Sequence, residues 1–201
     1  MMKQLSVLLL LVLLMSTFSG CGTRKEIHAD TSLFDVVCSA DEALEQAKTA
    51  GIPVMESLRC TAGQAVWDDF YQAVSADKES QVVCLMYYTL DRSHMTQEAY
   101  EAEKDDYPMA FFTLLSYDGE QYTVTVRQSS ETEPESEDTF PYLRHFTGKM
   151  PAQSHYSAYD AYVLVDDPNA TMEGIWAGMF SSSPEIASGY RHHTVYMNYM
   201  D

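Results

Sequence analysis

The most informative segment of the sequence reads MAFFTLLSYDGEQYTVTVRQ, residues 109–128. Two runs rich in β-branched and aromatic residues, 109–117 and 121–128, flank the pair Asp118-Gly119. Runs of this composition favour β-strands, and glycine adopts a positive φ without a steric cost, so the pair is typical of a tight turn. The segment therefore predicts a β-hairpin.

Residue types alternate along the second run of this hairpin. Apolar and polar positions follow one another in the order Tyr122, Thr123, Val124, Thr125, Val126 and Arg127. Because successive side chains of a strand point to opposite faces, this pattern predicts that the apolar set faces the core. The polar set, which ends in Arg127, is then expected to face solvent.

Several other segments have strand-like composition. These are residues 82–89, 142–146, 158–165 and 194–200. Two acidic stretches interrupt them. Residues 91–107 are too long for a tight turn and predict an excursion with a short helix over 96–104, whereas residues 129–139 predict a mobile acidic loop.

Helical periodicity appears mainly before the first strand. Ser39 and Glu42 form a capping box, which predicts a helix that ends at Gly51 and Pro53. Thr61 and Gln64 form a second box. It precedes apolar residues at helical spacing, namely Val66, Trp67, Phe70, Tyr71 and Val74.

A third, shorter helix is predicted over residues 171–180, after Asn169. Together these elements predict an α+β fold in which two N-terminal helices and one short C-terminal helix pack against an antiparallel sheet.

The N-terminal residues are typical of a secretion signal. Lys3 precedes an apolar run from Leu5 to Met15, which is too short to span a bilayer as a helix. The following Phe18-Ser19-Gly20-Cys21 resembles the lipobox that bacterial signal peptidase II cleaves once the cysteine sulfur carries diacylglycerol, although Phe18 stands where leucine is usual. We therefore predict a lipoprotein signal peptide over 1–20, with ordinary secretion as the alternative.

This interpretation divides the chain into three parts. Cys21 becomes the lipidated first residue, residues 21–33 a tether, and residues 34–201 a single α+β domain. Acyl chains such as palmitate hold a protein on a bilayer, so the predicted location is extracytoplasmic, with the membrane as a partner through Cys21.

Composition and charge exclude some functional classes. The chain has 201 residues, 46% of them apolar, and a formal net charge of −18. This apolar content lies outside the disordered class, and the scarcity of Lys and Arg argues against a nucleic-acid partner. A basic protein, a peptide or a cell-wall component is a more suitable partner.

No cofactor or metal is predicted from the cysteines and histidines. Cys38, Cys60 and Cys84 lack paired spacing and leave open either one disulfide with a free thiol or three reduced thiols, most simply buried as small hydrophobic side chains. His192 and His193 are adjacent, and adjacent side chains on a strand point to opposite faces, so both are poorly placed to bind one ion.

Several short segments resemble a known family. They are Asp35-Val36-Val37, the helix with Trp67 and Phe70, the strand from Val82-Val83 to Tyr88-Thr89, and Ser116-Tyr117-Asp118-Gly119. Over residues 35–127 the chain is similar to a family of uncharacterised Gram-positive lipoproteins, a domain of unknown function. It departs from that family by the acidic excursion before Pro108 and by Arg127, where an acidic residue is usual. The resemblance implies a small, lipid-anchored α+β body and no catalytic residue.

The aromatic content provides the candidate binding residues. The chain has 14 tyrosines, many of them in its last third, and Tyr156 and Tyr190 are the candidate ligand-binding residues. Rings that carry a hydroxyl suit glycan stacking and protein interfaces.

Two main functional hypotheses follow, and the catalytic residues of either are unknown. The first is a non-catalytic envelope module that binds a protein, a peptide or a wall component. The alternative is an envelope hydrolase with an unrecognised active site, which would use carboxylates such as Asp68, Asp69 or Asp160 with a histidine. A structural subunit of a larger envelope assembly is a third possibility.

Overall fold

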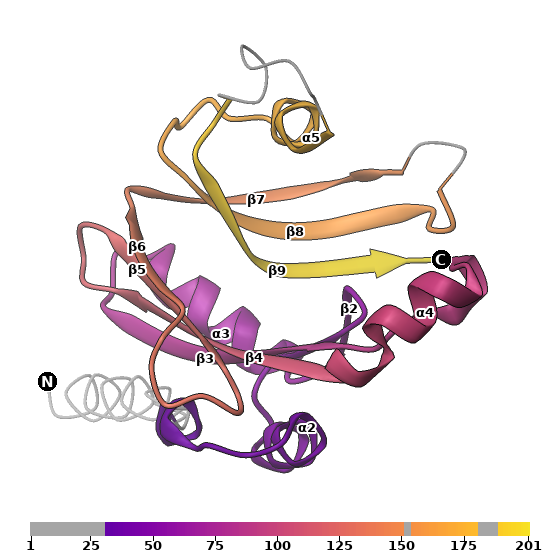
Figure 1. Ribbon diagram of the computed structural model, residues 1–201. Coiled ribbons are helices and arrows are strands. Elements are labelled where there is room, and N and C mark those ends of the chain that lie inside the picture. The colour runs from indigo at the N-terminus through magenta and orange to yellow at the C-terminus, as the bar shows by residue number, and fades with distance from the viewer. Residues whose placement is uncertain (1–30, 151–153, 181–188) are drawn as a thin grey trace, which may run out of the picture.

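The computed structural model describes residues 31–150, 154–180 and 189–201 (Figure 1). The predicted signal peptide and the lipidation candidate Cys21 lie outside these residues. Within them the α+β class is confirmed, with nine strands and four α-helices. The strands form two sheets rather than one, and no helix in this part of the chain is long and apolar enough to cross a membrane.

The larger sheet has the strand order β2-β1-β3-β4-β5-β6. Its strands are β1 (Val54–Glu56), β2 (Arg59–Ala62), β3 (Ser80–Tyr88), β4 (Met109–Tyr117), β5 (Tyr122–Gln128) and β6 (Ser136–Phe140). All pairings are antiparallel except that between β1 and β3. The short β1–β2 hairpin was not predicted.

The hairpin predicted over 109–128 is confirmed. β4 and β5 pair in register, with Leu115 opposite Val124. The connecting turn contains Gly119 at a φ of 96°, and Asp118 accepts main-chain hydrogen bonds from Glu120 and Gln121, both at 2.9 Å. The turn chemistry therefore fixed this register as expected.

The prediction that Arg127 faces solvent is wrong. Its side chain is 2% exposed, and Thr125 on the same face is 7% exposed. Both faces of the larger sheet are covered, so polar residues on β5 lie inside the protein. The guanidinium of Arg127 donates instead to main-chain carbonyls, including that of Val36 at 2.9 Å.

One face of the larger sheet is covered by the N-terminal elements. Helix α2 (Ala40–Ala50) begins at the predicted capping box: Glu42 N–H donates to the Ser39 hydroxyl, and Ser39 N–H donates to the Glu42 carboxylate. Together with η1 (Thr31–Asp35) it packs in a hydrophobic cluster with Val83, Leu85 and Phe112 of the sheet.

The other face carries α3 (Gln64–Val74), which lies between the two sheets (Figure 1). The helix and its aromatic stripe are confirmed, but the predicted capping box is wrong. Thr61 belongs to β2, and the N-cap is Gly63 at a φ of 72°. Trp67 is fully buried and stacks on Tyr196 of the smaller sheet at 4.8 Å between ring centroids.

The smaller sheet has the order β7-β8-β9. Its strands, all three predicted, are β7 (Tyr142–Lys149), β8 (Ala158–Val165) and β9 (His192–Met200). One face packs on α3 and the larger sheet, and the other packs on α5 (Met172–Phe180), the predicted C-terminal helix. The protein is therefore layered as α2, larger sheet, α3, smaller sheet and α5 (Figure 1).

Two arginines connect the sheets at opposite ends. Arg191 forms an ion pair with Asp166 at 2.8 Å and another with Asp138 of β6 at 3.2 Å. At the other end Arg59 of β2 pairs with Asp201, with guanidinium–carboxylate distances of 3.0 and 2.5 Å.

The two acidic stretches have different structures. Residues 92–106 form an excursion made of η2 (Arg92–His94), α4 (Gln97–Glu103) and η3 (Lys104–Asp106), so the predicted short helix is confirmed. Part of the predicted loop 129–139 is instead strand β6, an edge strand whose residues Ser136 to Thr139 are exposed. Because these side chains are exposed, β6 is held by its antiparallel main-chain pairing with β5 and not by the burial of apolar side chains.

Candidate ligand-binding pocket

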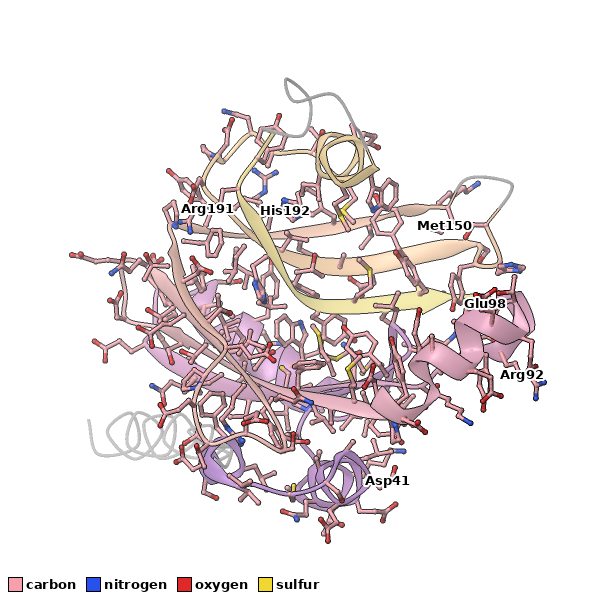
Figure 2. The ribbon with its side chains drawn as sticks, viewed as in Figure 1. Asp41, Arg92, Glu98, Met150, Arg191 and His192 are labelled. Atoms are coloured by element: carbon pink, nitrogen blue, oxygen red, sulfur yellow. The ribbon has the colours of Figure 1, made fainter. Side chains whose placement is uncertain are left out.

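A pocket of about 350 Å³ lies where the excursion meets the larger sheet and α2. Its lining residues are Asp41, Tyr87, Thr89, Leu90, Tyr100, Lys104, Tyr107 and Pro108. Asp41 is on α2, whereas Arg92 and Glu98 mark the excursion at the same end of the larger sheet (Figure 2). The pocket is therefore built from α2, the end of β3 and the excursion that follows it.

The inner wall is a pair formed by Tyr87 and Asp41. Tyr87 lies near the end of β3, is 8% exposed, and its hydroxyl donates a hydrogen bond to Asp41 Oδ1 at 2.7 Å. Burial, together with the neighbouring carboxylate, raises the pKa of Tyr87 to about 12. Tyr87 therefore stays a neutral donor, and it orients the carboxylate of Asp41.

The outer wall comes from the excursion. Tyr100 on α4 and Lys104, the residue that ends α4 and begins η3, are four positions apart, and both side chains line the pocket. The Arg92 guanidinium lies 5.0 Å from the centroid of the Tyr100 ring, and Lys104 pairs with Glu101 at 2.6 Å. These local contacts hold the two side chains in place.

The lining defines the chemistry that the pocket can perform. Three tyrosines supply apolar ring faces, Asp41 supplies a hydrogen-bond acceptor, and Lys104 supplies a donor. Such a mixture can hold a polar group with an apolar face, and its volume is at the small end of the range for ligand sites. The only sequence feature that pointed to this pocket was the long excursion. The contribution of Asp41 could not be predicted, because Asp41 is distant in sequence from the other lining residues.

The candidate Tyr156 lies just before β8 begins. It is half-buried, stacks on Tyr199 at 4.8 Å, and lies under the guanidinium of Arg59, which is 5.0 Å from its ring centroid. These contacts place Tyr156 beside the end of β9.

The candidate Tyr190 lies just before β9 begins. Its ring packs so closely on α5 that a Cβ added at Gly174 would come within 2.6 Å of it. Since β9 runs from His192 to Met200, Tyr156 and Tyr190 lie at opposite ends of the strand. The structure does not bring them together, and neither lines the pocket.

A second polar group lies between α3 and the smaller sheet. His145 Nε2 is 2.7 Å from Asp160 Oδ1, and the His145 ring stacks on Tyr162 at 4.1 Å between centroids. Asp68 on α3 and Asp160 both act to raise the pKa of Tyr162, which reaches about 12 mainly through burial. Two of the carboxylates considered for a hydrolase, Asp68 and Asp160, therefore lie near Tyr162, and the third, Asp69, is also on α3.

The three cysteines within the described residues are free thiols. Cys60 on β2 and Cys84 on β3 are separated by β1, and Cys60 is in register with Met86 instead of Cys84, so their Cα atoms are more than about 9.5 Å apart, beyond the reach of about 7 Å that a disulfide allows. Cys38 packs on the opposite face of the larger sheet. Burial raises the pKa of Cys60, so its sulfur is held as a thiol rather than a thiolate.

The adjacent His192 and His193 are the first two residues of strand β9. Burial lowers the pKa of His193, and His192 Nδ1 is 2.9 Å from the carbonyl oxygen of Tyr190. Among the residues that the structure describes, no group of three or more His, Cys, Asp or Glu side chains is arranged to hold a metal ion.

The chain was compared with protein-family models, with curated proteins and with solved structures, and none of them matches it.

Proposed function

We propose that this chain is a lipid-anchored protein of the bacterial envelope whose α+β domain is a non-catalytic binding module. The anchor part of the proposal rests on the signal-like N-terminus and Cys21. The binding part rests on one observation, the pocket in which Tyr87, Tyr100 and Tyr107 surround Asp41 and Lys104. Its ligand is a polar unit of a wall polymer or a peptide, stacked on tyrosine and hydrogen-bonded to Asp41.

Charge supports a macromolecular ligand with basic groups. The chain carries a formal net charge of −18, and Asp41 in the pocket is exposed. A negative surface accelerates the approach of a basic partner, and this effect weakens as salt screens it. Capture of a basic protein or peptide is therefore expected to fall as ionic strength rises.

Metabolic labelling tests the anchor. Cells that express the full chain are fed an alkyne analogue of palmitate, and the protein is examined for label and for fractionation with membranes. We expect label and membrane association in the native chain and neither in Cys21→Ala. A labelled Cys21→Ala protein would contradict lipidation at this residue.

Sedimentation with purified peptidoglycan tests the pocket. The full chain carrying Cys21→Ala is mixed with peptidoglycan, and the bound fraction is compared with that of the same chain carrying Tyr100→Ala. The matched control is Tyr142→Ala, which removes a tyrosine that is 40% exposed and outside the pocket. We expect Tyr100→Ala alone to lose binding, and equal losses would contradict a role for the pocket.

A hydrolase is the second candidate, and the pairing of His145 with Asp160 favours it. A carboxylate that orients a histidine supplies two of the three members of a hydrolytic triad. The nucleophile is the weak point, because burial holds Cys60 as a thiol. Release of soluble fragments from peptidoglycan by the native chain, lost in His145→Ala, would support the hydrolase over the binding module.

A further inference from the structure

The pocket beside α2 is lined by one acidic and one basic residue, and their charges are compensated differently. Lys104 forms an ion pair with Glu101 at 2.6 Å, so its positive charge is balanced within the excursion. Asp41 accepts a hydrogen bond from the neutral hydroxyl of Tyr87, and it has no ion pair within the part of the chain that the structure describes. The negative charge of Asp41 is therefore left for a ligand, which favours a cation.

The aromatic rings of the lining also suit a cation. Tyr87, Tyr100 and Tyr107 all line the pocket. The face of an aromatic ring carries partial negative charge and attracts a cation. Tyr100 makes such a contact already, because the Arg92 guanidinium lies 5.0 Å from the centroid of its ring. Arg92 is not a lining residue, so this contact does not fill the pocket.

The remaining surface of the pocket suits an alkyl chain. Leu90 and Pro108 add apolar atoms to those of the tyrosine rings. Long cationic side chains bury their methylene groups against apolar surface of this kind while the charged end stays close to water. The volume of about 350 Å³ is at the small end for ligand sites, which suits one side chain better than a large ring system.

Tyr87 limits how a cation can bind to Asp41. Its hydroxyl donates to Asp41 Oδ1 at 2.7 Å, so one carboxylate oxygen is already engaged and Oδ2 is the freer acceptor. A guanidinium binds a carboxylate best as a fork that uses both oxygens. An ammonium is a compact charge with three rotatable donors, so a single oxygen is enough for it. The pair of Tyr87 and Asp41 therefore favours an ammonium over a guanidinium.

We propose that the pocket binds a primary ammonium group at the end of an alkyl chain, as in the side chain of lysine or of another diamino acid in a peptide. The alkyl chain lies against the tyrosine rings, and the ammonium donates to Asp41 Oδ2. This inference rests on the proposed function, because it identifies the group that the binding module recognises. The net charge of −18 favours the approach of such a ligand.

Titration with capped tripeptides, followed by the amide NMR signals of the protein, measures this preference. The full chain carries Cys21→Ala, and the peptide has lysine between two alanines. Two further peptides replace the lysine by arginine or by Nε-acetyllysine, which has the same alkyl chain without the charge. We expect the lysine peptide to bind, the arginine peptide to bind about tenfold more weakly, and the Nε-acetyllysine peptide not to bind.

Two variants and a matched control assign the roles. Asp41→Asn keeps the shape of the side chain and is expected to weaken binding of the lysine peptide about tenfold or more. Tyr87→Phe frees Asp41 Oδ1, so the lysine and arginine peptides are expected to bind it with similar affinity. The control Glu45→Gln removes one exposed charge from the same helix outside the pocket, and we expect it to leave binding unchanged.

Two outcomes would overturn the ammonium inference. The first is a lysine peptide that binds no better than the Nε-acetyllysine peptide, which would mean that the charge is not recognised. The second is an equal loss in Asp41→Asn and Glu45→Gln, which would mean general attraction to an acidic surface. The peptidoglycan experiment separates these failures from failure of the proposed function, because sedimentation that still depends on Tyr100 would keep the binding module and reject only the ammonium ligand.

Discussion

Arg127 shows how one side chain can tie distant segments together. Its guanidinium donates to main-chain carbonyl oxygens of five residues, which are Phe34, Val36, Gln128, Ser129 and Glu131. It also lies 5.5 Å from the centroid of the Phe34 ring. The N-terminal segment is thereby attached to β5 and to the turn that follows it.

Replacement of Arg127 by methionine is expected to destabilise the protein by about 3 kcal/mol. Methionine fills much of the volume but leaves buried carbonyl oxygens without donors, each at a cost of about 1–3 kcal/mol before relaxation. Urea unfolding measures this change in the free energy of unfolding. The control Arg92→Met removes an exposed arginine, and we expect it to cost at most about 0.5 kcal/mol; equal costs would contradict the role given to Arg127.

The burial of individual side chains could be predicted where it follows from a local sequence pattern. The stripe with Trp67, Phe70 and Val74 was identified because helical spacing places these residues on one face. The exposure of Arg127 was predicted wrongly because the alternation pattern assumes that one face of the strand is exposed to solvent. The contact that covers it, with the carbonyl of Phe34, spans 93 positions in sequence, and no local pattern carries that information.

At the scale of the element, capping signals were informative but incomplete. Ser39 caps α2 and Thr96 caps α4, both through side-chain oxygens that accept main-chain N–H groups. Thr61 has the same motif spacing but is drawn into β2, because pairing with β1 takes priority. The start of α3 therefore depends on the backbone of Gly63 instead of on a capping side chain.

Gly63→Ala is expected to be far more damaging than Gly51→Ala. Both glycines have a positive φ near 73°, so alanine pays a similar backbone cost of about 1–2 kcal/mol at each. A Cβ at residue 63 would lie 2.2 Å from the carbonyl carbon of Ile52, whereas a Cβ at residue 51 meets nothing within 4 Å. Thermal unfolding of the two variants measures the difference, and comparable melting temperatures would contradict this close approach.

The excursion over residues 92–106 is expected to open locally. None of the side chains described in α4 is buried, and its ion pair between Glu101 and Lys104 is local. Elements with few buried contacts exchange amide hydrogens readily. We expect hydrogen exchange to be fast here and slow in β4, and equal protection of the two would contradict a loosely attached excursion.

At the scale of the whole molecule, the sequence predicted the inventory of elements better than their arrangement. Six of the nine strands were identified from composition, whereas β1, β2, β6 and the division of the strands into two sheets were not. That division depends on α3 lying between the sheets and on contacts such as Tyr199 N–H donating to the Leu58 carbonyl at 3.0 Å. The pocket was missed for the same reason, because Asp41 and Lys104 meet only after folding.

Buried tyrosines are expected to make the protein unstable in alkali. Burial is the main cause that raises the pKa of Tyr87, Tyr122 and Tyr162 to about 12. In the unfolded chain these hydroxyls ionise near pH 10, so above that pH the unfolded state binds fewer protons than the folded state. Their contribution is therefore fully present below about pH 10 and is lost as the pH rises toward 12.

Urea unfolding between pH 8 and pH 11 measures this loss. We expect the free energy of unfolding to be steady up to about pH 10 and then to fall steeply. Tyr122→Phe keeps the ring and removes one ionisable group, so its fall above pH 10 is expected to be shallower. A native chain with constant stability up to pH 11 would contradict the burial of these hydroxyls.

The attachment of η1 to β5 also has a mechanical consequence. In a chain held to a membrane at residue 21, any tension enters the domain through η1. The Arg127 guanidinium and the bond from Cys38 N–H to the Ser129 carbonyl, 2.9 Å long, would pass that load to β5 of the larger sheet instead of peeling away α2. The domain can then bear a pull on its anchor while the pocket beside α2 keeps its shape.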